Sequence, residues 1–124
     1  MIARNLLLTC MLMAAAVAPA TADPHPRCFS TAEMNGWRSP DGKTIYIRTG
    51  ADHYYRIELS RECSTLKSID PHLLLTNHSG GQVCSAPDLD VKASENGLVE
   101  PCFPKTLTEL SAAEAAALPK AARP

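Results

Sequence analysis

Five cysteines limit what this 124-residue chain can fold into more than any other feature of its sequence. Cys10 lies in an apolar N-terminal segment, and the other four follow it as Cys28, Cys63, Cys84 and Cys102. An even number of cysteines in a small exported domain is typical of a disulfide framework. The sequence therefore predicts two disulfides, which would help to hold so small a domain together and leave no free thiol for catalysis.

Residues 1–22 have the three parts of a secretory signal peptide. Arg4 gives a positive start, an apolar stretch follows, and Ala20-Thr21-Ala22 is a small-x-small cleavage site. The apolar stretch is shorter than the roughly 20 residues that a membrane-spanning helix needs. We expect a mature protein that begins at Asp23 and is periplasmic or secreted, with no membrane insertion after cleavage.

Removal of this leader leaves 102 residues, enough for one domain. Only one of the 12 basic residues, Arg4, is lost, so 11 basic residues face 13 acidic ones. A nucleic-acid-binding surface needs clustered basic residues, which this balance argues against. We expect no nucleic-acid partner and no cofactor.

The mature chain divides into three parts. Residues 23–27 form a proline-rich extended segment, residues 28–118 a single β-rich domain, and residues 119–124 a disordered tail. The expected fold is mainly β (small α+β), with an antiparallel sheet or partly closed barrel of about five to six short strands. A short C-terminal helix is predicted from the capping box Ser111-Ala112-Ala113-Glu114.

The clearest element is a β-hairpin. Residues 44–49 and 53–59 both alternate between apolar and polar side chains, which is typical of strands. A three-residue loop, 50–52, sets Ile47 opposite Tyr55 and keeps the apolar residues on one face. The inner face then holds Ile45, Ile47, Tyr55, Ile57 and Leu59, and the outer face holds Tyr46, Arg48, Tyr54, Arg56 and Glu58.

The elements around the hairpin are predicted from turn signals. Ser39-Pro40-Asp41-Gly42 is a turn. Residues 71–76 are predicted to form a buried strand, and residues 82–85 the start of its return strand. Pro87 interrupts the return strand, and residues 89–91 would continue it. Residues 102–107 are predicted to form a last extended segment.

The order of several short motifs resembles a family of small exported proteins of Gram-negative bacteria that is defined as a domain of unknown function. These motifs are Cys28-Phe29, Trp37 before the Pro-Asp-Gly turn, the strand 55–59, Cys63 with Leu66, Val83-Cys84-Ser85, Cys102 and the closing 110–114. The resemblance implies a periplasmic, disulfide-bearing, β-rich domain, and it implies no activity and no site residues.

The four cysteines leave three pairings open. We favour Cys63–Cys84 with Cys28–Cys102, because the first bond would tie the hairpin to the following strands and the second would tie the two ends of the domain. A zinc site would need close pairs such as C-x-x-C, which the chain lacks. We expect no metal site.

The outer face of the hairpin is the surface that could bind a partner. Tyr46, Arg48, Tyr54 and Arg56 would alternate there as aromatic rings and guanidinium groups. The sequence favours simple cross-strand stabilisation. The alternative is a contact patch, because tyrosine and arginine are enriched at binding hot spots.

The leading functional hypothesis is a non-enzymatic periplasmic domain that binds a protein or an envelope component, or has a structural role. The second is a small secreted inhibitor of an envelope-acting enzyme. A small enzyme is third, because no catalytic motif is present and so short a chain rarely builds a deep active site.

Overall fold

The structure is a computed structural model that describes residues 27–78 and 80–124. The predicted leader, its cleavage site and nearly all of segment 23–27 lie outside these residues. Two antiparallel sheets form the described part, which confirms the expected mainly β class. One sheet has the order β1 (Met34–Arg38), β2 (Thr44–Thr49), β3 (His53–Leu59) and β7 (Pro104–Leu110), and the other has the order β4 (His72–Asn77), β5 (Leu89–Glu95) and β6 (Leu98–Cys102).

The hairpin β2–β3 has the predicted register. Ile45 pairs with Ile57, Ile47 with Tyr55, and Arg48 with Tyr54. The predicted inner residues are all buried, whereas the four Tyr and Arg residues of the outer face are partly exposed. The alternation of β-branched and aromatic residues was therefore enough to orient the whole hairpin.

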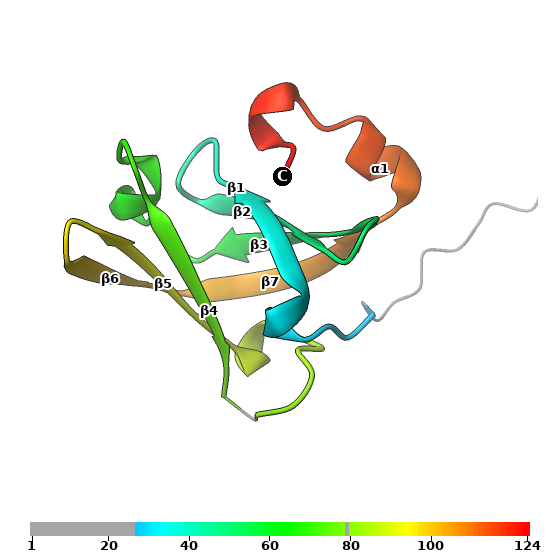
Figure 1. Cartoon of the computed structure of the whole chain (residues 1–124), viewed down its shortest axis with the longest axis horizontal. Coiled ribbons are helices and arrows are strands. Elements are labelled where there is room, and N and C mark those ends of the chain that lie inside the picture. Colours follow the sequence, from blue (N-terminus) through cyan, green and yellow to red (C-terminus); the bar gives the residue numbers. More distant parts are fainter. Residues whose placement is uncertain (1–26, 79) are drawn as a thin grey trace, which may run out of the picture.

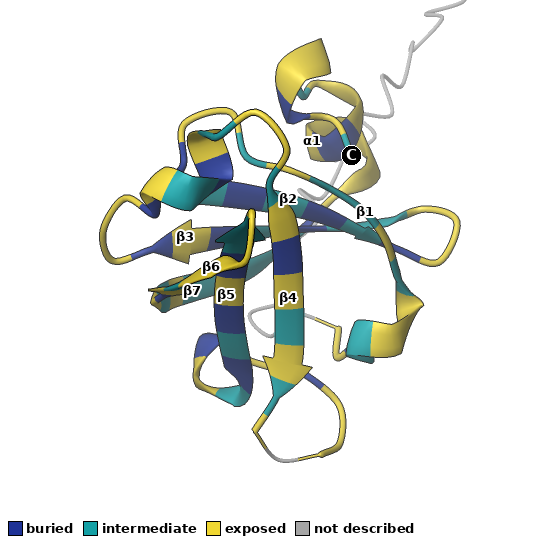
Figure 2. Cartoon of the chain, turned by 60° about the vertical axis from the view of Figure 1, so that its left-hand side comes forward, coloured by how far each residue is buried: buried dark blue, intermediate teal, exposed yellow. Residues whose placement is uncertain are grey.

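The two sheets face each other, with β4 and β5 running across the direction of β2 and β3 (Figure 1, Figure 2). They are continuous on one side, where the chain leaves β6 at Cys102 and enters β7 at Pro104. A strand that bends from one sheet into the next is the usual corner of such crossed packing. The buried core lies between the sheets and takes side chains from both, among them Ile47, Ile57, Leu73 and Val91.

The described residues form seven strands, and their two sheets do not close into a barrel. The return strand starts later than residues 82–85, because Val83 forms only an isolated bridge with Phe29. It is β5, which begins at Leu89 after the 3-10 helix η3 (Ala86–Asp88) and pairs with β4, so its expected continuation over residues 89–91 is confirmed. Strand β6 was not predicted. Strand β4 is only half buried, because its outer face is not covered by the other sheet.

The C-terminal helix is α1 (Ala112–Ala116), and its predicted capping box is present, with Ser111 Oγ accepting from the Glu114 N–H at 3.1 Å. The expected disordered tail 119–124 is wrong. It contains the 3-10 helix η4 (Lys120–Ala122), in which Ala122 is only 3% exposed. The Arg123 guanidinium donates to the carbonyl of Leu118 at 2.9 Å, which anchors the segment. Helix α1 ends at Ala116, and Pro119 caps the start of η4 rather than ending the ordered part of the chain.

Candidate functional site

The β1–β2 turn is fixed by a short polar network. Asp41 Oδ1 accepts from the backbone N–H groups of Lys43 and Thr44 at 2.9 and 2.7 Å. Burial would raise the pKa of Asp41, but these N–H groups outweigh it and hold that pKa below its ordinary value. Gly42 has φ +73°, and its carbonyl accepts from the Cys63 N–H at 2.8 Å. The end of β1 is thereby held against the chain that follows β3.

That chain forms the 3-10 helix η2 (Ser64–Lys67), which is held from two directions. The disulfide Cys63–Cys102 joins its start to the end of β6. The Glu100 carboxylate accepts from the Thr65 N–H at 2.8 Å and from the Ser64 hydroxyl at 3.2 Å. Hydrogen bonds from Thr65, and then from Ser64, hold the pKa of Glu100 below its ordinary value of 4.5. Helix η2 is therefore a rigid support for the loop after it.

The loop 68–71 leads from η2 to β4 and carries an apolar side chain at its tip. Ile69 is 100% exposed. The loop is tied on both sides of Ile69, since Ser68 Oγ donates to the Thr65 carbonyl at 2.6 Å and the Asp70 N–H donates to Glu95 Oε1 at 3.4 Å. Its conformation thus presents an isoleucine to solvent from an anchored position.

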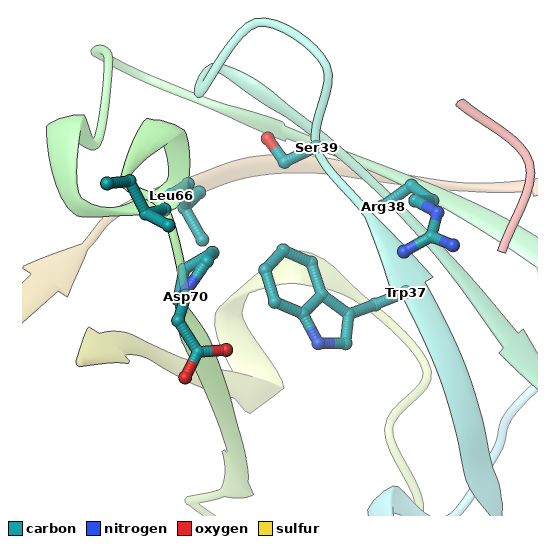
Figure 3. A pocket seen from close by; sticks show the side chains of 7 residues that line it. Trp37, Arg38, Ser39, Leu66 and Asp70 are labelled. Carbon is teal, nitrogen blue, oxygen red and sulfur yellow. The ribbon is translucent and has the colours of Figure 1, made fainter. Parts of the chain in front are cut away.

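Between this loop and the end of β1 lies an open hollow of about 360 Å³ (Figure 3). The Trp37 indole lies across it, with Arg38 on one side and Leu66 and Asp70 on the other. Trp37 is partly buried and packs against the core. Its indole N–H has no hydrogen-bond acceptor among the described residues. The hollow therefore combines an aromatic wall, a free donor and charges of both signs. Its full lining is Trp37, Arg38, Ser39, Leu66, Ile69, Asp70 and Pro71.

The sequence did not bring these residues together. Trp37 was noted only as a motif before the Pro-Asp-Gly turn, and Ile69 and Asp70 were given no role. The one available signal was Ile69, which lies in a polar stretch just before Pro71. This isoleucine belongs to no periodic apolar pattern that would predict its burial. The pairing of β1 with β2 and the position of η2 could not be read from the sequence.

The outer hairpin face has the predicted members but is not a free patch. Arg48 Nε donates to Asn35 Oδ1 at 2.8 Å, and Arg56 Nε lies 3.5 Å from Glu58 Oε1. The Arg48–Asn35 bond joins β2 to β1, whereas Arg56 and Glu58 both lie on β3. Strand β1 extends the face, because Arg38 pairs with Tyr46.

The C-terminal segment lies against part of this face. Gly36 pairs with Arg48, and a methyl group on Gly36 would meet Pro124 at 3.5 Å. Tyr54 lines a second hollow together with Ala115 and Arg123. Segment 111–124 therefore lies over the row that contains Arg48 and Tyr54, and the row of Tyr46 and Arg56 lies beside it. A contact patch of all four side chains would have to share its surface with this segment.

The favoured disulfide pairing is wrong. The bonds join Cys28 to Cys84 and Cys63 to Cys102. The bridge between Phe29 and Val83 sets the residues next to them side by side, and Cys28 and Cys84 are those residues. Cys102 lies at the β6–β7 corner, next to Cys63 at the start of η2. Both relationships depend on sheet topology rather than on spacing along the chain.

A polar cluster lies at one end of the core. The Tyr55 hydroxyl donates to the Arg27 carbonyl at 2.9 Å, and the Arg27 N–H donates to Glu109 Oε2 at 2.7 Å. Burial, and then the Glu109 carboxylate, raise the pKa of Tyr55. His53 Nδ1 lies 3.9 Å from Glu109 Oε1. These contacts tie the start of the domain to the core. The Tyr55 phenol has a raised pKa and donates its proton to a carbonyl, so it is poorly suited to act as a base.

Asp88 forms structural contacts just before β5. Asp88 accepts from the N–H groups of Cys84 and Ser85 at 2.9 and 3.0 Å, which lowers its pKa and closes the turn before β5. Within the described residues, no three or more His, Cys, Asp or Glu side chains are grouped as metal ligands.

Fold and disulfides define a small, mainly β domain of two antiparallel sheets with a hollow at one open side. The chain belongs to the family of unknown function DUF6491, whose model matches residues 1–124. No curated protein and no solved structure matches the chain. Across the described part, no helix is both long and apolar enough to span a membrane.

Proposed function

We propose that this protein is an exported binding domain of the periplasm that holds a protein or envelope component at the hollow beside Trp37. The observation that carries the proposal is the position of Ile69, fully exposed on an anchored loop next to a half-buried tryptophan. Burying one isoleucine side chain is worth roughly 1.5–3 kcal/mol, so a partner that covers Ile69 gains affinity. Tryptophan and arginine at the same place are the residue types that dominate binding hot spots.

Export is supported by the leader of residues 1–22 and by the two disulfides, which persist in an oxidising compartment. A non-enzymatic role is supported by the chemistry of the hollow. It combines an indole, a guanidinium and a carboxylate on an open surface. The one hydroxyl in its lining, that of Ser39, donates to the Thr44 carbonyl at 2.8 Å and not to a base that would activate it.

The second candidate function is inhibition of an envelope-acting enzyme. The same loop favours it, because Ile69 protrudes from a segment fixed by the Cys63–Cys102 disulfide and by Pro71. A rigid loop with an exposed apolar residue loses little conformational entropy when it enters an enzyme pocket. In this case the partner would be a hydrolase, and its activity would fall on binding.

Affinity capture tests the proposal. The mature protein is immobilised and exposed to a periplasmic extract, beside the variants Ile69→Asp and Val99→Asp. Val99 is also exposed, at 57%, but lies on the outer face of the three-stranded sheet, so it is a matched control. We expect a partner that the parent and Val99→Asp retain and that Ile69→Asp loses at least tenfold. Equal recovery on Ile69→Asp would reject this surface.

A further inference from the structure

The two sheets are open on the side opposite the β6–β7 corner. Strand β1 is the terminal strand of one sheet and β4 is the terminal strand of the other. The 3-10 helix η1 (Thr31–Glu33), which precedes β1, contacts β4, and the end of β1 shares the hollow with the residues before β4. The two terminal strands thus lie on the same side of the molecule (Figure 1). We call this side, which carries β1 and β4, the open side.

No strand among the described residues pairs with the outer edge of β1. Among the described residues, β1 pairs only with β2, and β4 pairs only with β5. A terminal strand presents a row of N–H and C=O groups that another extended chain can pair with. Strand β1 has a bulge at Asn35, whose side chain bonds back to Arg48 and Gly50. Regular pairing is therefore available along Gly36–Arg38, directly beside the hollow.

Apolar side chains lie behind these backbone groups. Met34 and Trp37 of β1 and Leu75 of β4 are only partly buried, and all three pack against the core from the open side. The hollow lies at the end of this strip, and its volume suits one or two apolar side chains.

The charges at the hollow indicate which residues would fit. Asp70 lies 3.8 Å from His72 Nε2. The Arg38 guanidinium, by contrast, has no carboxylate partner among the described residues. A guanidinium with open donors binds a carboxylate well.

We infer that the open side binds an extended peptide segment of the partner, which adds as a strand to Gly36–Arg38. An apolar side chain of that segment enters the Trp37 hollow, and an acidic side chain near it meets Arg38. In this mode of recognition main-chain hydrogen bonds supply affinity and pockets for alternate side chains supply specificity. This inference rests on the proposed function and specifies the chemistry of its partner.

A display library of random decapeptides provides the probe. Peptides are selected on the folded, mature protein, and the best is synthesised with one backbone N-methyl group at each position in turn. We expect methylation to weaken binding at least tenfold at alternate positions and less than twofold between them, because only every second N–H of an added strand faces its neighbour. Arg38→Gln should weaken binding fivefold or more, whereas Lys105→Gln, at an exposed position on β7, should not.

Three results would overturn strand addition: no peptide selected, no alternation in the methyl scan, or equal binding by Arg38→Gln. Sedimentation that showed a dimer through β1 would also overturn it, in favour of a second copy of this chain. The proposed function is judged separately. If Ile69→Asp loses the partner captured from extract while no peptide binds, the binding domain stands and only the strand mechanism is rejected.

Discussion

Cys63 and Cys102 are joined across the corner at which the chain passes from the three-stranded into the four-stranded sheet, with their Cα atoms 5.6 Å apart. The bond closes a segment of 39 residues, a closure worth roughly 4 kcal/mol in the chain-entropy model. Both cysteines are buried, at 2% and 4% exposure. The bond also fixes the start of η2, so it supports the loop that carries Ile69.

The two disulfides should differ in their sensitivity to reductant. Cys28 and Cys84 are exposed, whereas Cys63 and Cys102 are buried, and thiol–disulfide exchange requires access to the sulfur. We expect a mild phosphine reductant under native conditions to open Cys28–Cys84 first. Alkylation and peptide mapping at increasing reductant concentration measure the order. Simultaneous loss of both bonds would mean that the corner opens as easily as the surface.

The hairpin makes a paired stability prediction. Ile57 is fully buried between the sheets, so Ile57→Ala should lower the free energy of unfolding by roughly 2–5 kcal/mol through lost burial and a cavity. Arg56 lies on the other face and pairs with Glu58 near solvent, so Arg56→Ala should cost less than about 1 kcal/mol. Urea melts of both variants measure the difference. A larger loss of stability in Arg56→Ala than in Ile57→Ala would mean that the buried and exposed faces of the hairpin are assigned the wrong way round.

Local patterns predicted the parts of this fold that depend on neighbours in sequence. The face assignment of Ile45 and Tyr55, the turn at Asp41 and the cap at Ser111 all follow from alternation or from short-range hydrogen bonds. The disulfide pairing did not follow, because it depends on the bridge between Phe29 and Val83, which lie far apart in the chain. The candidate hollow was missed for the same reason.

The C-terminal segment was also predicted incorrectly, and it allows a matched test. Ala122 is buried and Ala121 beside it is exposed. Ala122→Asp would bury an unpaired carboxylate or expel the segment, and should lower the free energy of unfolding by roughly 1–3 kcal/mol. Ala121→Asp should change it by less than about 0.5 kcal/mol. Thermal melts of the two variants measure this difference. Identical curves would mean that the C-terminal segment adds nothing to stability.

Acid should weaken the support under η2. The pKa of Glu100 is lowered in the folded state, so its ionised form stabilises the fold above the unfolded pKa of 4.5. This stability is lost as the pH falls through the lower pKa of the folded state. Glu100→Gln should cost about 1 kcal/mol at pH 7 and show a smaller loss between pH 7 and pH 3 than the parent.

Urea melts at the two pH values measure this effect. The control is Glu62→Gln, which removes an exposed carboxylate that pairs with Lys67 at 3.2 Å. We expect it to keep the acid sensitivity of the parent. An unchanged acid response in Glu100→Gln would show that other carboxylates carry the pH dependence.

Photo-crosslinking in the cells that produce the protein tests the binding surface most directly. A photoreactive side chain is placed at Ile69, or at Ala51 on the exposed β2–β3 loop as the control. We expect one dominant crosslinked species at position 69, none at position 51, and loss of the species when Arg38→Gln is added. Equal crosslinking at both positions, or none at position 69, would contradict a partner at the hollow beside Trp37.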